Sequence, residues 1–177
     1  GVTHEIATAR PIGMTDPREI LHETFGFADF RGRQAEVIER VMAGEHSLAV
    51  MPTGAGKSLT YQIPALARPG TGLVISPLIA LVHDQVRAAE AVGIRAAALT
   101  SADDDRRDTI ERFRAGQLDL LYVAPERATT DNFRRMIEHR PLALIAIDEA
   151  HCVSEWGHDF RPDYRRLRPL LDLYPEV

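Results

Sequence analysis

The stretch Met51-Pro-Thr-Gly-Ala-Gly-Lys-Ser58 decides the fold class, because it follows a short apolar run and opens a stretch with helical spacing. Unpaired N–H groups and the positive end of the helix dipole favour anions at such a junction. Glycines let the backbone approach a phosphate, lysine reaches the β- and γ-phosphates and a serine hydroxyl ligates Mg²⁺. The pattern predicts a loop that binds the phosphates of a nucleoside triphosphate. The expected contacts are Thr53, Gly54, Ala55, Gly56, Lys57 and Ser58.

Lysine is rare in this chain. Of its 21 Lys and Arg residues, Lys57 is the single lysine. Lysine places a compact point charge on a flexible stem, which the planar fork of arginine does not. We therefore predict a catalytic role for Lys57 at the phosphates. Met51 stands where the strict pattern has glycine, so a chance Gly-Lys-Ser in a glycine-rich turn is the alternative.

Short apolar runs alternate with helical stretches along the chain. The runs are Ser47–Met51, Gly72–Ser76, Arg95–Thr100, Leu118–Ala124 and Leu142–Ile147. The helical stretches are Pro17–Phe25 after an Asp16 N-cap, Arg33–Met42, Lys57–Ala67, Ile79–Val92, Asp103–Ala115, Asp131–His139 and Asp163–Leu173. Runs that are apolar nearly throughout are typical of strands buried on both faces. The sequence thus predicts an α/β fold of the P-loop class, a parallel sheet with helices on both faces.

Two carboxylates follow the last of these apolar runs. Asp148 and Glu149 come directly after Leu142–Ile147. In parallel α/β sheets, ligands bind at the carboxyl ends of the strands. Asp148 is therefore predicted to hold Mg²⁺ together with Ser58, and Glu149 to be the general base for the attacking water. A loop start or a helix N-cap is the alternative for such a pair taken alone.

The composition limits the function. A net charge of −5 argues against bulk attraction to nucleic acid but leaves room for a local basic cluster. One such cluster, which could equally be a solvated helix face, consists of Arg161, Arg165, Arg166 and Arg168. The single Cys152 excludes an internal disulfide and a multi-cysteine zinc site. No apolar run reaches the length of a membrane span and no signal pattern opens the chain, so we expect an intracellular protein without a membrane partner.

Taken together, the phosphate loop and the acidic pair resemble the first motor domain of a superfamily 2 helicase. Finer matches resemble the RecQ family of DNA helicases. Phe25–Gln34 is similar to the motif 0 of that family, Ser76–Gln85 to motif Ia and Tyr122–Arg127 to motif Ib. This resemblance implies a RecA-like domain that binds ATP and Mg²⁺.

The resemblance also implies roles for single residues. Phe27 would stack on adenine, with Arg31 and Gln34 in contact with it. Cys152–Arg161 resembles the aromatic-rich loop that senses single-stranded DNA, and its aromatic rings could stack on bases. Ordinary core aromatics are the alternative for that stretch. The residues implied in DNA binding or coupling are Pro77, Leu78, His151, Trp156, His158, Phe160 and Arg161.

For domain organisation, we expect an N-terminal arm over residues 1–15 and the first RecA-like domain over 16–177, ending before motif III. As the resemblance implies, a second motor domain, a zinc-binding domain with the only Zn²⁺ and a winged-helix domain would lie outside this sequence. The whole protein would move 3′ to 5′ along single-stranded or partly duplex DNA. It would act in the cytoplasm or nucleoid, or in the nucleus of a eukaryote. We expect the chain alone to bind ATP weakly, hydrolyse it poorly and unwind nothing.

Three other functions stay open at this point. An RNA helicase of superfamily 2 shares Lys57, Asp148 and Glu149 but should lack the aromatic stretch. A nucleotide-gated binding module would bind ATP without turnover. A small-molecule kinase fits the phosphate loop but leaves the stretch from the acidic pair to the aromatic residues unexplained.

Overall fold

The computed structural model describes residues 16–43, 55–77, 79–99, 106–138 and 140–147, with the side chains of residues 55–57 left out. Within these ranges, four strands form one parallel sheet in the order β2-β3-β1-β4. Their bounds are β1 Thr71–Ile75, β2 Ala96–Leu99, β3 Leu120–Val123 and β4 Leu142–Ile147. Because all four run the same way, their carboxyl ends lie along one edge of the sheet.

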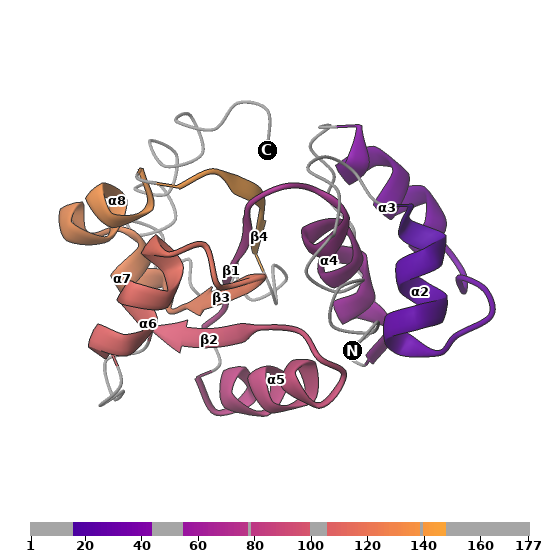
Figure 1. Ribbon diagram of the computed structural model, residues 1–177, viewed down its shortest axis with the longest axis horizontal. Coiled ribbons are helices and arrows are strands. Elements are labelled where there is room, and N and C mark those ends of the chain that lie inside the picture. The colour runs from indigo at the N-terminus through magenta and orange to yellow at the C-terminus, as the bar shows by residue number, and fades with distance from the viewer. Residues whose placement is uncertain (1–15, 44–54, 78, 100–105, 139, 148–177) are drawn as a thin grey trace, which may run out of the picture.

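The helices lie in two layers, one on each side of the sheet (Figure 1). Their bounds are α2 Pro17–Phe25, α3 Gln34–Met42, α4 Ala55–Ala67, α5 Ile79–Ala91, α6 Arg106–Arg114, α7 Pro125–Ala128 and α8 Asp131–Ile137. Each layer packs on the sheet through its own cluster of buried side chains. The helices α2 to α5 pack on one face of the sheet, and α6 to α8 pack on the other.

Alternate residues of each strand serve the two clusters. In β1, Val74 faces the α2–α5 layer, whereas Leu73 and Ile75 face the α6–α8 layer. In β3 the same alternation places Tyr122 on the first face and Leu121 on the second. Since both faces are covered, the strands are apolar throughout, and the predicted P-loop-class fold is confirmed within the described part of the chain.

The strand β4 joins the sheet with an irregularity. Its register against β1 shifts between Thr71 and Gly72, so that Ala143 is the extra residue of β4. As a result Leu142 faces the α6–α8 layer, and Leu144, two positions on, faces the other layer. An extra residue of this kind is a β-bulge, and here it changes which side chains face each layer.

Most of the predicted elements are confirmed. Asp16 is the N-cap of α2, and its side chain accepts a hydrogen bond from the backbone N–H of Arg18 at 3.0 Å. Gly26 ends that helix with a left-handed φ of 74°. The helix predicted from Asp103 begins at Arg106 within the described residues, and the one predicted to reach His139 ends at Ile137. The predicted strand Ser47–Met51 and helix Asp163–Leu173 lie outside the described ranges.

Two contacts hold the amino-terminal edge of the sheet and the α4 layer in place. Gly72 lies so close to α4 that an added Cβ would meet the Cβ of Ala65 at 2.7 Å. At the start of β3, the carboxylate of Asp119 accepts hydrogen bonds from the backbone N–H and the guanidinium of Arg95. The hydrogen bonds that the Arg95 guanidinium donates to Asp119 raise the pKa of Arg95. Both contacts lie away from the edge at which the strands end.

None of the helices in the described ranges is long and apolar enough to cross a membrane.

Candidate nucleotide site

The sequence motifs meet at the carboxyl edge of the sheet. The motif Ia stretch begins with Ser76 directly after β1, and Pro125–Arg127 of motif Ib follows β3 after one residue. The acidic pair follows β4, which ends at Ile147. Since β1 lies between β3 and β4, the three strands that lead into these segments end side by side. Ligands bind at this edge in open α/β folds.

The phosphate loop opens α4, as predicted. The backbone of Ala55, Gly56 and Lys57 forms the first turn of this 13-residue helix, so its free N–H groups point toward the loop. The Ser58 side chain is half-buried in the same turn. Thr53 and Gly54 lie outside the described residues. The first turn of α4 contains no acidic residue. No carboxylate of the helix therefore competes with a bound anion at the positive end of its dipole.

A pair of buried tyrosines connects this helix to the sheet. The hydroxyl groups of Tyr61 in α4 and Tyr122 in β3 are 2.8 Å apart, and the two rings meet edge to face with centroids 6.2 Å apart. Tyr122 is fully buried, and Tyr61 is 7% exposed. The contact joins the helix that starts at the phosphate loop to the strand that ends at motif Ib. Nothing in the sequence spacing of 61 residues indicated it.

We expect the tyrosine pair to be coupled energetically. Tyr61→Phe and Tyr122→Phe should each lower the free energy of unfolding by about 0.5–1.5 kcal/mol, because each loses the hydrogen bond between the hydroxyls. The double variant should lose less than the sum of the two. Urea denaturation of the four proteins in a double-mutant cycle measures the difference. Strict additivity would show that the hydroxyl contact contributes nothing.

The stretch similar to motif 0 forms a loop between α2 and α3. Phe27 is 45% exposed, and Arg31 is exposed as well. Gln34, the first residue of α3, is only 7% exposed, and its Oε1 accepts a hydrogen bond from the backbone N–H of Arg31 at 2.8 Å. The loop thus presents an aromatic face and an oriented amide.

Contacts from α2 that sequence reasoning missed hold this loop. Arg18 forms an ion pair with Asp29 at 3.0 Å, and its guanidinium lies 5.3 Å from the centroid of the Phe30 ring. The Nε2 of His22 lies 2.7 Å from the carbonyl oxygen of Ala28, which can only accept, so the histidine donates. These pairs join a helix to an irregular loop, and no periodic pattern in the sequence marks them.

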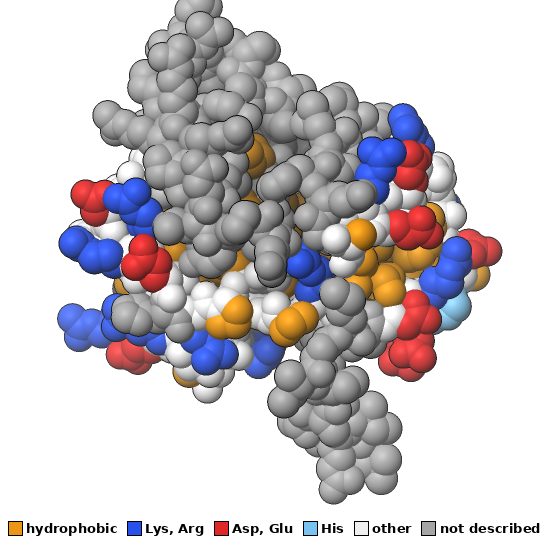
Figure 2. Space-filling model, turned by 90° about the horizontal axis from the view of Figure 1, so that it is seen from above, with side chains coloured by type: hydrophobic (Ala, Val, Ile, Leu, Met, Phe, Trp, Pro, Cys, Tyr) orange, Lys and Arg blue, Asp and Glu red, His pale blue; other side chains and the backbone are white. Residues whose placement is uncertain are grey.

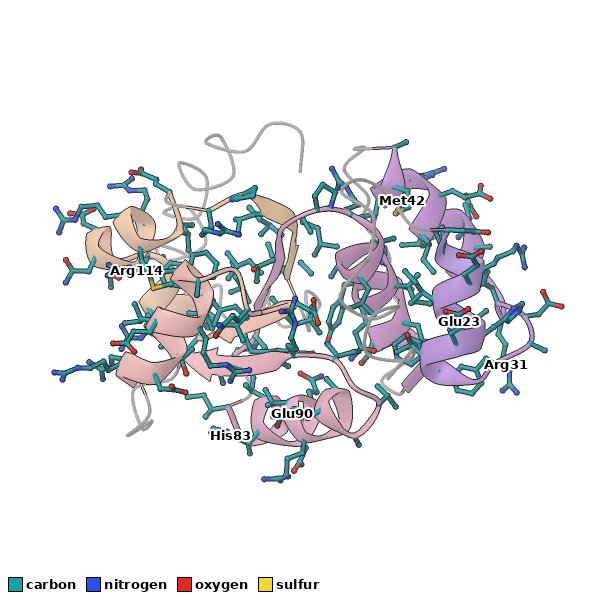
Figure 3. All side chains as sticks on the ribbon, viewed as in Figure 1. Glu23, Arg31, Met42, His83, Glu90 and Arg114 are labelled. Atoms are coloured by element: carbon teal, nitrogen blue, oxygen red, sulfur yellow. The ribbon has the colours of Figure 1, made fainter. Side chains whose placement is uncertain are left out.

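The loop lies at the end of the helix layer where α4 begins (Figure 1). The Arg68 side chain, just after α4, donates to the carbonyl oxygen of Val41, near the end of α3, at 3.1 Å. The two helices therefore run in the same direction. Figure 3 shows Met42 and Arg31 at opposite ends of α3, with Arg31 toward the start of α4. The α2–α3 loop and the first turn of α4 therefore lie toward the same end of this helix layer.

Several predicted site residues lie outside the described ranges, so their roles stay predictions. These residues are Leu78, Asp148, Glu149, His151, Trp156, His158, Phe160 and Arg161. Pro77, in contrast, is half-buried between β1 and α5. The described part of the chain holds no group of three or more His, Cys, Asp or Glu side chains that could hold a metal ion by itself. Ser58 and Asp148, the predicted ligands of Mg²⁺, are oxygen donors of the kind that this ion prefers.

This geometry defines a class of protein: an α/β domain of the P-loop class, with a parallel sheet covered by helices on both faces. A family model described as DEAD/DEAH box helicase matches residues 31–176. The chain belongs to the DEAD/DEAH box helicase family.

Individual relatives are more specific than the family description. The chain is 47% identical over 161 residues to an ATP-dependent DNA helicase RecQ of Pasteurella multocida, covering 90% of this chain and 26% of that protein. It is 45% identical to the RecQ helicase of Bacillus subtilis over 87% of this chain and 27% of the relative. It is 42% identical to the ATP-dependent helicase SGS1 of Saccharomyces cerevisiae over 89% of this chain and 12% of the relative. The resemblance to RecQ helicases is confirmed, and the chain spans about a quarter of the length of the bacterial relatives.

Proposed function

We propose that this chain is the first motor domain of an ATP-dependent 3′–5′ DNA helicase. The observation that supports the proposal is that the strands leading into motif Ia, motif Ib and the acidic pair end side by side at one sheet edge, in a chain 47% identical to a RecQ helicase. The nucleotide would bind at that edge. Motifs Ia and Ib, on the strands beside it, would contact single-stranded or partly duplex DNA.

Each site residue has a proposed task. Lys57 and the N–H groups of α4 bind the phosphates, and Phe27, Arg31 and Gln34 hold the adenine. Ser58 and Asp148 would hold Mg²⁺, which neutralises phosphate charge when it is bound. Glu149 takes the proton of the attacking water.

The proposed catalytic site needs a further part. Phosphoryl transfer requires a positively charged group beside the γ-phosphate to stabilise the transition state, and an arginine finger often supplies it. We propose that a second motor domain of the same protein supplies it, and that this partner explains why the isolated chain should hydrolyse ATP poorly. The aromatic stretch with Trp156, Phe160 and Arg161 would report bound DNA to the nucleotide site. With such a partner, the protein would act where the DNA is, in the cytoplasm, nucleoid or nucleus.

An RNA helicase is the second candidate, because the DEAD/DEAH family description does not separate DNA from RNA. The test compares the ATPase rate of the polypeptide extended through its second motor domain with single-stranded DNA and with RNA of the same sequence. We expect DNA to stimulate hydrolysis roughly tenfold more than RNA, a difference of about 1.4 kcal/mol in activation free energy.

Other outcomes have clear meanings. Equal or stronger stimulation by RNA would favour the RNA helicase. ATP binding without turnover under either condition would favour a nucleotide-gated binding module. Strand displacement by the 177-residue chain alone would contradict the need for a second motor domain.

A further inference from the structure

The α2–α3 loop is held at three consecutive residues around its exposed phenylalanine. The backbone N–H of Gly26 donates to the carbonyl oxygen of His22 at 3.1 Å. The N–H of Phe27 donates to the carbonyl oxygen of Leu21 at 3.2 Å. The carbonyl oxygen of Ala28 accepts from Nε2 of His22 at 2.7 Å. His22 therefore binds the residues on both sides of Phe27, through its backbone on one side and its side chain on the other.

Only the side-chain bond of His22 depends on the residue type. The two backbone bonds belong to the end of α2, where Gly26 has a left-handed φ of 74°, and any residue can supply the accepting carbonyl oxygens. The bond to Ala28 needs an N–H on a side chain that reaches it, as the histidine ring does. Arg18, one turn earlier in α2, pairs with Asp29, but both side chains are exposed and such pairs contribute little.

The place of the Phe27 ring depends on these bonds. They hold the backbone at Gly26, Phe27 and Ala28, and so fix the direction in which the Phe27 side chain leaves the loop. The ring is 45% exposed, so a ligand can reach it. A loop that is ordered before binding saves the entropy of ordering it on binding, which raises affinity. Charged side chains of both signs lie beside hydrophobic ones at this end of the molecule (Figure 2, right), so charge alone does not select a ligand here.

We propose that His22 is a positioning residue for base recognition, because its side chain fixes the Phe27 ring in place and thereby raises the affinity for the adenine part of ATP. The proposal rests on the proposed function, in which Phe27 stacks on adenine. His22 itself contacts neither the base nor the phosphates, and it lies outside the Phe25–Gln34 stretch that resembles motif 0. Its effect should appear only for ligands that carry a base, because the phosphates bind at the start of α4.

The test compares His22→Ala with Glu23→Ala in the 177-residue chain. Glu23 is the matched control, because it is exposed in the same turn of α2 (Figure 3) and makes no hydrogen bond or ion pair with any residue of the described ranges. Competition with a fluorescent ATP analogue measures the affinities for ATP and for inorganic triphosphate. His22→Ala should weaken ATP binding roughly two- to tenfold, as expected for one lost hydrogen bond, and leave triphosphate binding unchanged. Glu23→Ala should change neither affinity.

Two further measurements separate a positioning role from a purely structural one. His22→Gln should restore most of the ATP affinity, because glutamine also carries an N–H donor at the end of its side chain. In a Phe27→Ala background, His22→Ala should have no further effect on ATP affinity, since His22 acts only through the ring. Urea denaturation checks that every variant is folded.

Each contrary result has a distinct meaning. Equal ATP affinities of His22→Ala and the unsubstituted chain would overturn the role of His22 and leave the proposed function intact. A parallel loss for ATP and triphosphate, or losses of His22→Ala and Phe27→Ala that simply add, would assign His22 to the stability of the loop and overturn the positioning role. No binding of ATP by the unsubstituted chain would overturn both proposals.

Discussion

Replacing Lys57 with alanine is expected to weaken ATP binding roughly 10²- to 10⁴-fold, the largest effect expected of any single change at the proposed site. Hydrogen bonds from a charged donor to phosphate contribute about 1.5–3 kcal/mol each, and about 1.4 kcal/mol corresponds to a factor of ten. Two such bonds, to the β- and γ-phosphates, give the expected loss. A titration with a fluorescent ATP analogue, followed by competition with ATP, measures it.

The matched control is Lys57→Arg, which keeps the charge. Arginine should restore only part of the affinity, because its planar fork does not replace a compact ammonium group between two phosphates. A chemical test is independent of mutation, since Lys57 is the only lysine in the chain. An ATP-derived acylating probe should label this side-chain amine, and ATP should protect it. Labelling of the folded chain that ATP does not reduce would refute the phosphate-loop assignment.

Two phenylalanines should give opposite results when each is replaced with alanine. Phe113 in α6 is fully buried among the side chains between the sheet and the α6–α8 layer. Phe113→Ala should lower the free energy of unfolding by about 3–5 kcal/mol, because it removes a ring and leaves a cavity. Phe27, 45% exposed in the α2–α3 loop, is the counterpart. Phe27→Ala should change stability by no more than about 0.5 kcal/mol.

The loss at Phe27 should appear in nucleotide binding instead. Stacking of a base on an aromatic ring contributes about 1–3 kcal/mol, so ATP affinity should fall roughly five- to 150-fold. Inorganic triphosphate, which has no base, should bind Phe27→Ala as it binds the unsubstituted chain. Urea denaturation and the two titrations complete the comparison. A parallel fall in affinity for ATP and for triphosphate would show that Phe27 acts on the loop structure rather than on adenine.

The fold class could be read from the sequence because its signals are local. Apolar runs such as Leu118–Ala124 match a strand with both faces buried, and the structure has β3 there. The cap Asp16 acts on a neighbouring backbone group, so it marked the start of α2 correctly. The glycine-rich loop predicted the start of α4 in the same way. The short helix α7 was not predicted, since four residues after a strand have no measurable periodicity.

The candidate site was predictable only as a set of motifs. The groups proposed for each motif lie close together in the sequence, so phosphate, adenine and acidic segments could be predicted one by one. Their common position depends on the strand order β2-β3-β1-β4, which no local pattern contains. Family resemblance supplied the adenine contacts, whereas Arg18 and His22, which hold that loop, became visible only in the structure.

By itself, therefore, the sequence determined a P-loop α/β chain of the helicase family with one lysine at its phosphate loop. The tertiary structure decided which distant segments of the chain contact each other. It joined Tyr61 to Tyr122 across α4 and β3, and it placed the His22 side chain against the α2–α3 loop. The physical reason is that propensity, capping and burial act over a few residues. Contacts between distant segments follow from how whole helices and strands pack.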